Sequence, residues 1–329
     1  MNSTSYIKIC LLLFLFIPVL SYGQIDSSDV DDFVRKTAYQ LKQPLEEIES
    51  VISKASFQSD IIDKMNKPYE KSMSWERYRN IFMTPERIQA GLTFWKENED
   101  VLNEVSASSG VDVFAIIGIL GVETYFGQRM GNYKVLDALY TLAFGYPRRS
   151  SFFKAELAKF LELCQKEGLD PLEIKGSYAG AMGYGQFMPS SYLAYAKSYD
   201  QETGADMMND PYDGIASVAN YLKVHRWENG GLVAVEANKK EGAESLSKQK
   251  TKPSNPLSYY IERGYEPAIS IEQNTLASLH SMEMEDQSLE HWITFKNFYV
   301  ITRYNQSPLY ALAVFQLGEA IQNARRSNQ

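Results

Sequence analysis

A single carboxylate stands inside an apolar stretch of this chain. In VFAIIGILGVETYFGQ, residues 113–128, every side chain before Glu123 is aliphatic, aromatic or absent. Burial disfavours the charged form of a carboxylate, so a glutamate partly withdrawn from water keeps its proton closer to neutral pH. Such a group suits general acid catalysis, for example proton donation to a glycosidic oxygen. The spacing alone also allows a glutamate that ends a helix and faces solvent.

Other common catalytic patterns are missing. The three histidines, His225, His280 and His291, are scattered and form neither an HExxH motif nor a Cys/His cluster, so a zinc enzyme is not predicted. In GSYAG the serine, Ser177, stands one position too early for the GxSxG motif of serine hydrolases. No GK[ST] follows the nearby glycines, which argues against a nucleotide-binding loop. We therefore expect no cofactor.

The glycines themselves form a cluster. GSYAGAMGYGQFMP contains Gly176, Gly180, Gly183 and Gly185 within ten residues. Glycines at this density would be costly inside a helix, so the segment is predicted to be a loop. One reason for such a loop is a backbone that folds closely around a ligand, and the other is a tight turn without a ligand. Taken alone, the segment favours the tight turn.

Helical periodicity dominates the elements that must position these residues. TPERIQAGLTFWKENEDVL begins with Thr84–Pro85, a predicted N-cap followed by proline at the first helical position. DPYDGIASVANYLKVH repeats this pattern with Asp210–Pro211, and SPLYALAVFQLGEAI repeats it with Ser307–Pro308. Apolar residues follow each start at helical spacing: Ile88, Leu92 and Trp95; Ile215, Val218, Ala219 and Leu222; Leu309, Leu312, Ala313 and Leu317.

The composition changes near residue 236. ANKKEGAESLSKQKTKPSNP is polar and lysine-rich without a period, which predicts a loop. TLASLHSMEME and HWITFKNFYVITRY follow, and the second is crowded with strand-favouring residues from Trp292 to Thr302. We therefore expect a mainly α fold (α+β overall). It has a helical region over 24–236, a polar loop and a small inserted β-rich subdomain over 237–303, and a C-terminal helix over 304–329.

Residues 1–23, MNSTSYIKICLLLFLFIPVLSYG, have the features of a secretory signal peptide: a lysine, an apolar run and small residues before the expected cleavage site. The run is too short for a good membrane span. Its removal leaves Cys164 as the only thiol, so no internal disulfide is expected. The net charge of −8 becomes −9 when Lys8 is lost. Such a chain lacks the basic footprint of nucleic-acid binding.

Four segments, taken together, resemble one known family. The segments are GVETYFGQRMGNYKVLDALYTLAFGYPRR, KGSYAGAMGYGQFMPSSY, DPYDGIASVANYLKVH and FYVITRYNQSPLYALAVFQLGEAI. In this order and at these separations, they resemble the membrane-bound lytic murein transglycosylase B family, glycoside hydrolase family 103. The resemblance runs from about Trp75 to Ile321 and is weakest over 237–290. It implies a lysozyme-like, mostly helical catalytic core with a small β domain, which agrees with the change in composition.

The resemblance also implies roles for individual residues. Glu123, in GVET, corresponds to the family's sole catalytic acid/base. Ser177 and Gln186 correspond to residues that line the cleft near the scissile sugar, where Ser177 orients the substrate's N-acetyl group. The other implied glycan contacts are Tyr78 in WERYR, Arg148 and Arg149 in YPRR, Tyr221 in VANY, and Tyr304, Asn305 and Tyr310 in RYNQSPLY.

Two family features are not expected here. Some members carry an EF-hand-like calcium loop, but in SYDQETGADMMNDP a sixth-position Gly204 places Tyr199 at the first position, where an aspartate ligand is needed. We therefore expect no metal. Well-known members are lipid-anchored, but Cys10 lies at the start of the apolar run and is a poor acylation site. A periplasmic protein, soluble after removal of the signal peptide, is expected.

The activity implied by the resemblance is that of a lytic transglycosylase, with peptidoglycan glycan strands as partner. It cleaves between N-acetylmuramic acid and N-acetylglucosamine and forms 1,6-anhydromuramic ends, with one glutamate and the substrate's N-acetyl group doing the chemistry. Two alternatives stay open. A lysozyme-like muramidase, a hydrolase, needs a second carboxylate, for which Asp137 in VLDALYTL is the best candidate, although a structural role at a helix start explains it more simply. A non-catalytic peptidoglycan-binding scaffold is the other.

Overall fold

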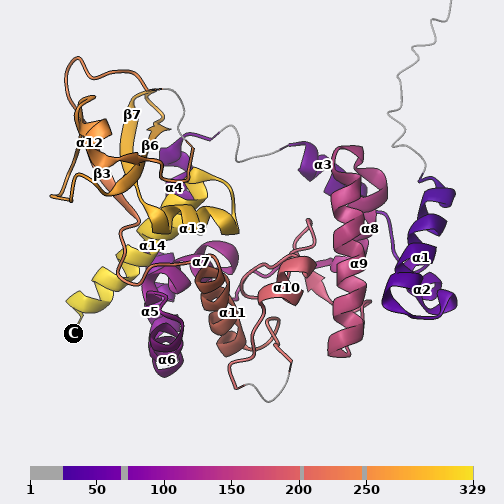
Figure 1. The fold of residues 1–329 in the computed structure, drawn as a ribbon. Coiled ribbons are helices and arrows are strands. Elements are labelled where there is room, and N and C mark those ends of the chain that lie inside the picture. Colours follow the sequence, from indigo (N-terminus) through magenta and orange to yellow (C-terminus); the bar gives the residue numbers. More distant parts are fainter. Residues whose placement is uncertain (1–24, 68–72, 201–203, 247–249, 329) are drawn as a thin grey trace, which may run out of the picture.

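The computed structural model describes residues 25–67, 73–200, 204–246 and 250–328 (Figure 1). The predicted signal peptide, residues 1–23, lies outside the described residues. Helices predominate, and the elements in chain order are α1 (Ser27–Leu41), α2 (Leu45–Ile52), α3 (Ser59–Asn66), α4 (Trp75–Phe82), α5 (Pro85–Glu97), α6 (Glu99–Ser109), α7 (Val113–Thr124), β1 (Tyr133–Lys134), α8 (Val135–Gly145), η2 (Pro147–Arg149), α9 (Ser150–Glu167), β2 (Lys175–Gly176), α10 (Pro189–Tyr195), α11 (Pro211–Val224), β3 (Ala234–Lys239), β4 (Asn255–Pro256), α12 (Leu257–Ile261), β5 (Tyr265–Pro267), β6 (Leu276–Glu283), β7 (Leu289–Thr294), α13 (Lys296–Tyr304) and α14 (Pro308–Ser327).

The three predicted helix starts are confirmed. The side chains of Thr84, Asp210 and Ser307 each accept a hydrogen bond from a backbone N–H in the first turn of α5, α11 and α14. A proline occupies the start of each helix, where its missing N–H would be unpaired in any case. These starts depend on a few neighbouring residues, which is why the sequence reveals them.

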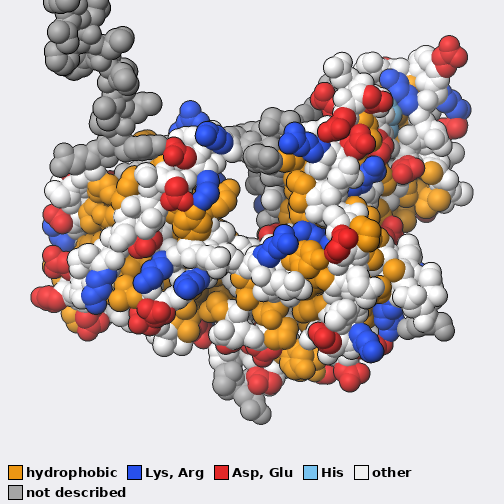
Figure 2. Space-filling model, turned by 180° about the vertical axis from the view of Figure 1, so that it is seen from behind, with side chains coloured by type: hydrophobic (Ala, Val, Ile, Leu, Met, Phe, Trp, Pro, Cys, Tyr) orange, Lys and Arg blue, Asp and Glu red, His pale blue; other side chains and the backbone are white. Residues whose placement is uncertain are grey.

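The helices form two halves with a hollow between them. Figure 1 shows α8 and α9 with α1 and α2 in one half, and the β-sheet with α4 and α13 in the other. α5, α6, α7 and α11 lie below, and α10 lies between the halves. Figure 2 shows the surface deeply hollowed between the two halves. One continuous helical core, which includes the buried residues of α7, α8, α11 and α14, holds the halves together.

The small β-rich subdomain is also confirmed. Its five strands pair antiparallel in the order β4-β6-β7-β3-β5. β6 and β7 form a hairpin in which Glu283 faces Leu289 and Leu279 faces Ile293. Leu257, Tyr260 and Ile293 belong to a second, separate core between the sheet and α12. The subdomain therefore has an apolar interior of its own, beside the helical core.

Two predictions within this region are wrong. Residues 296–302 were expected to continue the strands, but Lys296–Tyr304 is helix α13, which buries Phe298, Val300 and Ile301 against α14. Strand propensity reflects packing surroundings more than backbone preference, so the helical packing prevails. The polar loop was expected to begin at residue 237, but β3 continues to Lys239 because its backbone pairs with β5 and β7.

No single described helix is both long and apolar enough to cross a membrane. α6 and α7 meet such a test of length and composition only as a pair, with a bend of 118° between them. Most of α7 is buried in the helical core.

Candidate active site

Glu123 lies at the end of a helix that packs backbone to backbone against α14. Residues 115–121 of α7 are buried, whereas Glu123 itself is partly exposed. A Cβ atom added to Gly118 would lie 2.3 Å from the carbonyl oxygen of Val314, so only glycine permits this approach. The close crossing brings the last turn of α7 to the first turn of α14.

Tyr310, in the first turn of α14, holds the carboxylate. Its hydroxyl donates a 2.6 Å hydrogen bond to Oε1 of Glu123, and the residue is only 2 % exposed. Burial first, and then the negative charge of Glu123, raise the pKa of Tyr310 well above its ordinary value. The hydroxyl therefore stays protonated and fixes the orientation of the carboxylate.

Two further tyrosines belong to the same cluster. The ring of Tyr304 lies 6.4 Å from that of Tyr310 and nearly parallel to it, and its hydroxyl donates to the carbonyl of Gly185. The ring of Tyr221 lies 4.7 Å from that of Tyr304, and its hydroxyl donates to the carbonyl of Arg303. Burial raises the pKa of both tyrosines, that of Tyr221 to about 12. These hydroxyls tie α11 to α13, and α13 to the glycine loop, residues 176–187.

The chain turns sharply at the end of α7. Tyr125, Phe126 and Gly127 have φ angles of 53°, 58° and 86°, a left-handed run that costs non-glycine residues on the order of 1–2 kcal/mol each. Thr124 stabilises the turn, because its hydroxyl accepts from the N–H of Gly127 and donates to the carbonyl of Tyr184, both at 2.9 Å. Thr124 was not among the residues predicted from the sequence. The sequence feature that could have identified it is a threonine at the end of a predicted helix, because a short hydroxyl side chain there can bond nearby backbone groups.

Ser177 lies near the start of the glycine loop. Its Oγ accepts hydrogen bonds from the backbone N–H groups of Ala179 at 3.3 Å and Ala181 at 3.0 Å. A serine hydroxyl that accepts twice still carries one hydrogen to donate. A Cβ atom added to Gly131 would lie 2.1 Å from the carbonyl oxygen of Gly176. The loop that follows α7 therefore touches the glycine loop through its backbone.

Gln186 bonds the glycine loop to the segment that follows α7. Its Nε2 donates to the carbonyl of Met130 at 3.0 Å and to that of Gly183 at 3.1 Å. Its backbone N–H also donates to the Gly183 carbonyl, at 3.0 Å. Glu123, Ser177 and Gln186 are thus linked through two loops in direct contact.

The four clustered glycines are required by packing of the protein on itself. A Cβ atom added to any of them would lie closer to another protein atom than real Cβ contacts allow. The distances are 2.2 Å at Gly176 to the Ala181 carbonyl, 2.4 Å at Gly180 to Leu139, 2.4 Å at Gly183 to the Met207 carbonyl, and 2.7 Å at Gly185 to the Tyr304 hydroxyl. The tight-turn reading of this loop accounts for all four.

Tyr78 and Asn305 flank the cluster. Tyr78 is buried on α4, with its ring 5.2 Å from that of Phe82. It contributes to the raised pKa of Tyr310, after burial, Glu123 and Tyr304. Asn305 is exposed just after α13, and its Oδ1 accepts from the N–H of Ser307 at 3.1 Å. Asn305 thereby helps to begin α14, the helix that carries Tyr310.

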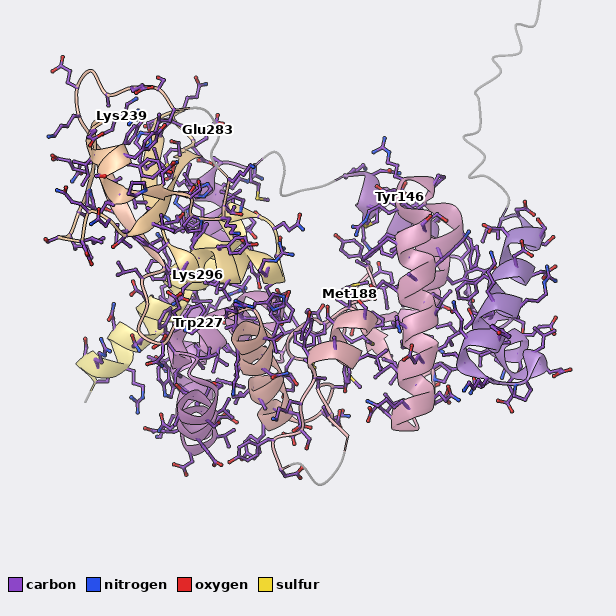
Figure 3. All side chains as sticks on the ribbon, viewed as in Figure 1. Tyr146, Met188, Trp227, Lys239, Glu283 and Lys296 are labelled. Carbon is purple, nitrogen blue, oxygen red and sulfur yellow. The ribbon has the colours of Figure 1, made fainter. Side chains whose placement is uncertain are left out.

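Arg148 and Arg149 lie in the other half of the molecule. They form part of η2, directly after Tyr146, which Figure 3 shows at the end of the α8–α9 half. Both are exposed, and the guanidinium of Arg149 lies 4.2 Å from the ring centroid of Phe152. These arginines therefore come from the α8–α9 half, whereas Glu123 and Tyr310 come from α7 and α14.

Asp137 has a clear structural role. Its Oδ1 accepts from the N–H of Ser56 at 2.8 Å, and its Oδ2 accepts from Nε2 of Gln58 at 3.4 Å. These bonds attach the segment before α3 to the first turn of α8. Both carboxylate oxygens are thus engaged, which favours the structural reading over a second catalytic carboxylate.

We expect Asp137→Asn to lower the free energy of unfolding by about 1 kcal/mol and to leave the reaction product unchanged. The amide keeps one acceptor oxygen, so only one hydrogen bond is lost. Thermal melting and product analysis by mass spectrometry measure the two effects. Loss of turnover with an intact circular dichroism spectrum would instead assign Asp137 to catalysis.

The segment compared with a calcium loop makes other contacts through both side chains and backbone. The hydroxyl of Tyr199 donates to Glu104 at 2.6 Å, and both oxygens of Asp213 accept backbone N–H groups, from Tyr199 and Asp206. Among the described residues, no group of three or more histidine, cysteine, aspartate or glutamate side chains could hold a metal ion. Residues 201–203 lie outside the described part, so the absence of calcium stays a prediction.

Comparison with known proteins identifies the family. Residues 26–319 match the family described as Transglycosylase SLT domain. The chain is 42 % identical over 303 residues to the membrane-bound lytic murein transglycosylase B of Escherichia coli (strain K12). The aligned region covers 90 % of this chain and 82 % of that protein.

Solved structures agree with this match. The Escherichia coli lytic transglycosylase Slt35 in complex with calcium is 39 % identical with a TM-score of 0.83, covering 90 % of this chain and 93 % of that one. SltB3 from Pseudomonas aeruginosa, in complex with NAG-NAM-pentapeptide, is 27 % identical with a TM-score of 0.79, covering 91 % and 80 %. With Glu123, the glycine loop and the helices around them in the expected order, the chain belongs to the transglycosylase SLT domain family of lytic murein transglycosylases.

Proposed function

We propose that this chain cleaves peptidoglycan glycan strands between N-acetylmuramic acid and N-acetylglucosamine and leaves 1,6-anhydromuramic ends. The observation that carries the proposal is the contact between Glu123 and Tyr310 beside the touching loops of Ser177 and Gln186. The relatives support it by their names, and the SltB3 complex with NAG-NAM-pentapeptide supports a glycan substrate that carries a peptide.

In the first step, protonated Glu123 donates its proton to the glycosidic oxygen as the bond from that oxygen to C1 of the muramic residue breaks. The carbonyl oxygen of the substrate's own N-acetyl group bonds to C1 and forms an oxazolinium ring, so no carboxylate nucleophile is needed. Ser177, which still has a hydrogen to donate, orients the N-acetyl group. Gln186 fixes neighbouring polar groups of the sugar.

In the second step, the ionised Glu123 takes the proton from the C6 hydroxyl of the same muramic residue. The C6 oxygen bonds to C1, the bond from C1 to the acetamido oxygen breaks, and the 1,6-anhydro ring closes. Glu123 regains its proton and water is not consumed. The hydrogen bond that Tyr310 donates to Glu123 is stronger when Glu123 is ionised. Tyr310 therefore holds the carboxylate in place between the two steps.

Mass spectrometry of digested sacculi tests the proposal. A transglycosylase produces anhydromuramic ends, a muramidase produces reducing ends, and a binding scaffold produces neither. Anhydro ends that incorporate no ¹⁸O from labelled water are the expected result. Reducing ends that carry ¹⁸O, or no new ends at all, would overturn the proposal.

We expect Tyr310→Phe to lower kcat about 10- to 100-fold with little change in KM. The ring remains to fill the same space, but the charge-assisted hydrogen bond to Glu123 is lost, and such bonds are worth about 1.5–3 kcal/mol. Steady-state release of muropeptides measures the effect.

Tyr260→Phe is the matched control for this change. Tyr260 is fully buried in the core of the β-rich subdomain, and its hydroxyl contacts Asn255 at 3.2 Å. Its removal alters stability and leaves kcat unchanged. An equal kcat for wild type and Tyr310→Phe would remove the positioning role of Tyr310.

Export to the periplasm is part of the proposal. It is supported by residues 1–23, which have the charge, apolar run and small residues of a signal peptide. The substrate is a polymer of the cell wall, so an exported enzyme would meet it directly.

A further inference from the structure

Two guanidinium groups lie against one aromatic ring just after Glu123. The Cζ atom of Arg87 is 4.8 Å from the ring centroid of Tyr125, and that of Arg129 is 5.0 Å from the same centroid. Arg87 comes from α5, and Arg129 comes from the loop that follows α7. Arg129 is exposed, whereas Arg87 is only 7 % exposed.

Arg87 is bonded only in part. Its Nη1 donates to the carbonyl of Gly121 at 2.9 Å, in the last turn of α7, where a cation is favourable. Its Nε is buried and has no hydrogen-bond partner. In the described part of the chain, no carboxylate forms an ion pair with Arg87 or Arg129.

The two like charges disfavour each other. Burial, and then the charge of Arg129, lower the pKa of Arg87 below its ordinary value. An anion beside the pair would reverse this penalty, because each guanidinium offers a planar fork of donors that matches a carboxylate. A pair of close cations without an acid therefore indicates a place for an anion brought by a ligand.

The pair lies next to the groups assigned to catalysis. The N–H of Arg129 donates to the carbonyl of Thr124 at 2.8 Å, and the neighbouring carbonyl, that of Met130, accepts from Gln186. A glycan strand bound at Glu123 therefore passes close to Arg129. Its muramic residues carry carboxylates, either on the lactyl group or on the attached peptide.

We propose that Arg129, supported by the buried charge of Arg87 and the ring of Tyr125, binds a carboxylate of the muramic arm. The inference rests on the proposed function and adds to it a recognition site for the acidic arm of the substrate. Arg148 and Arg149 belong to η2, between α8 and α9, and are not part of this site.

Binding measurements in the Glu123→Gln background test this site, because strands then stay intact and the result does not depend on turnover. Three substrates are compared: peptide-bearing strands, strands stripped by an amidase to expose free lactyl carboxylates, and stripped strands whose carboxylates have been converted to methylamides. We expect Arg129→Gln to raise Kd about tenfold for strands with a carboxylate and to leave Kd for the methylamide strands unchanged. The rise should shrink as salt increases.

The substrates for which Kd rises identify the carboxylate that Arg129 binds. A rise for the stripped strands assigns the lactyl group, a rise for the peptide-bearing strands assigns the stem peptide, and either supports the site. Arg129→Lys should raise Kd by about threefold, since it keeps the charge and loses the planar fork. Arg35→Gln is the charge-matched control, because Arg35 is exposed on α1 and pairs with Asp32. It should leave Kd unchanged for all three substrates.

An equal rise for all three strands, or no rise for any, would overturn the site. Failure of the proposed function gives a different result. In that case wild-type protein releases no anhydro ends, while the dependence of Kd on Arg129 and on the substrate's carboxylates is still measured directly.

Discussion

Glu123→Gln is expected to lower the release of anhydromuropeptides by roughly 10²–10⁴-fold while the protein stays folded, because general acid–base catalysis contributes about that much. The amide is nearly the size of the carboxylate, so α7 keeps its packing against α14. Its oxygen still accepts from Tyr310. What it lacks is a transferable proton, and the proposed reaction uses that proton in both steps.

Glu162→Gln is the matched control. Glu162 lies on α9 and forms an ion pair with Lys159 one turn away, 40 % exposed. The change removes one carboxylate and should leave turnover at the wild-type level. Circular dichroism and binding to intact sacculi confirm that both variants are folded. Near-normal release by Glu123→Gln would overturn the central assignment.

Gly183→Ala is expected to destabilise the protein by about 2–5 kcal/mol, which combines a left-handed backbone penalty with the cost of overpacking. Gly183 has a φ of 71°, and an added Cβ would lie 2.4 Å from the Met207 carbonyl oxygen. That carbonyl accepts the N–H of Tyr184 at 2.9 Å. The carbonyl of Gly183 accepts both N–H groups of Gln186, so activity should fall together with stability.

Gly168→Ala separates the left-handed backbone penalty from the cost of overpacking. Gly168 has a φ of 65° at the end of α9, but nothing lies within 4 Å of an added Cβ. This variant pays the backbone term alone, so its loss of stability should be about 1 kcal/mol. Chemical denaturation followed by circular dichroism measures both changes. Equal losses for the two variants would show that the contact with Met207 relaxes without cost.

The sequence by itself determined the features that depend on neighbouring residues. Thr84–Pro85, Asp210–Pro211 and Ser307–Pro308 each begin a helix as predicted, because an N-cap and a first-turn proline act within one turn. Glu123 was found in the same way, as one carboxylate ending an apolar run. Long motifs in a fixed order then identified the family, and with it the fold class and the proposed roles of Ser177 and Gln186.

The tertiary structure alone decided what depends on partners far away in the chain. Lys296–Tyr304 is a helix although its residues favour strands, because its apolar side chains pack against α14. Tyr310 lies 187 positions from Glu123 in the sequence. It donates a hydrogen bond to Glu123 because glycines let α7 and α14 pack closely together. Arg87 and Arg129 share one ring for the same reason. Propensity and spacing act over a few residues, whereas packing and charge act through space, so no local pattern contained these contacts.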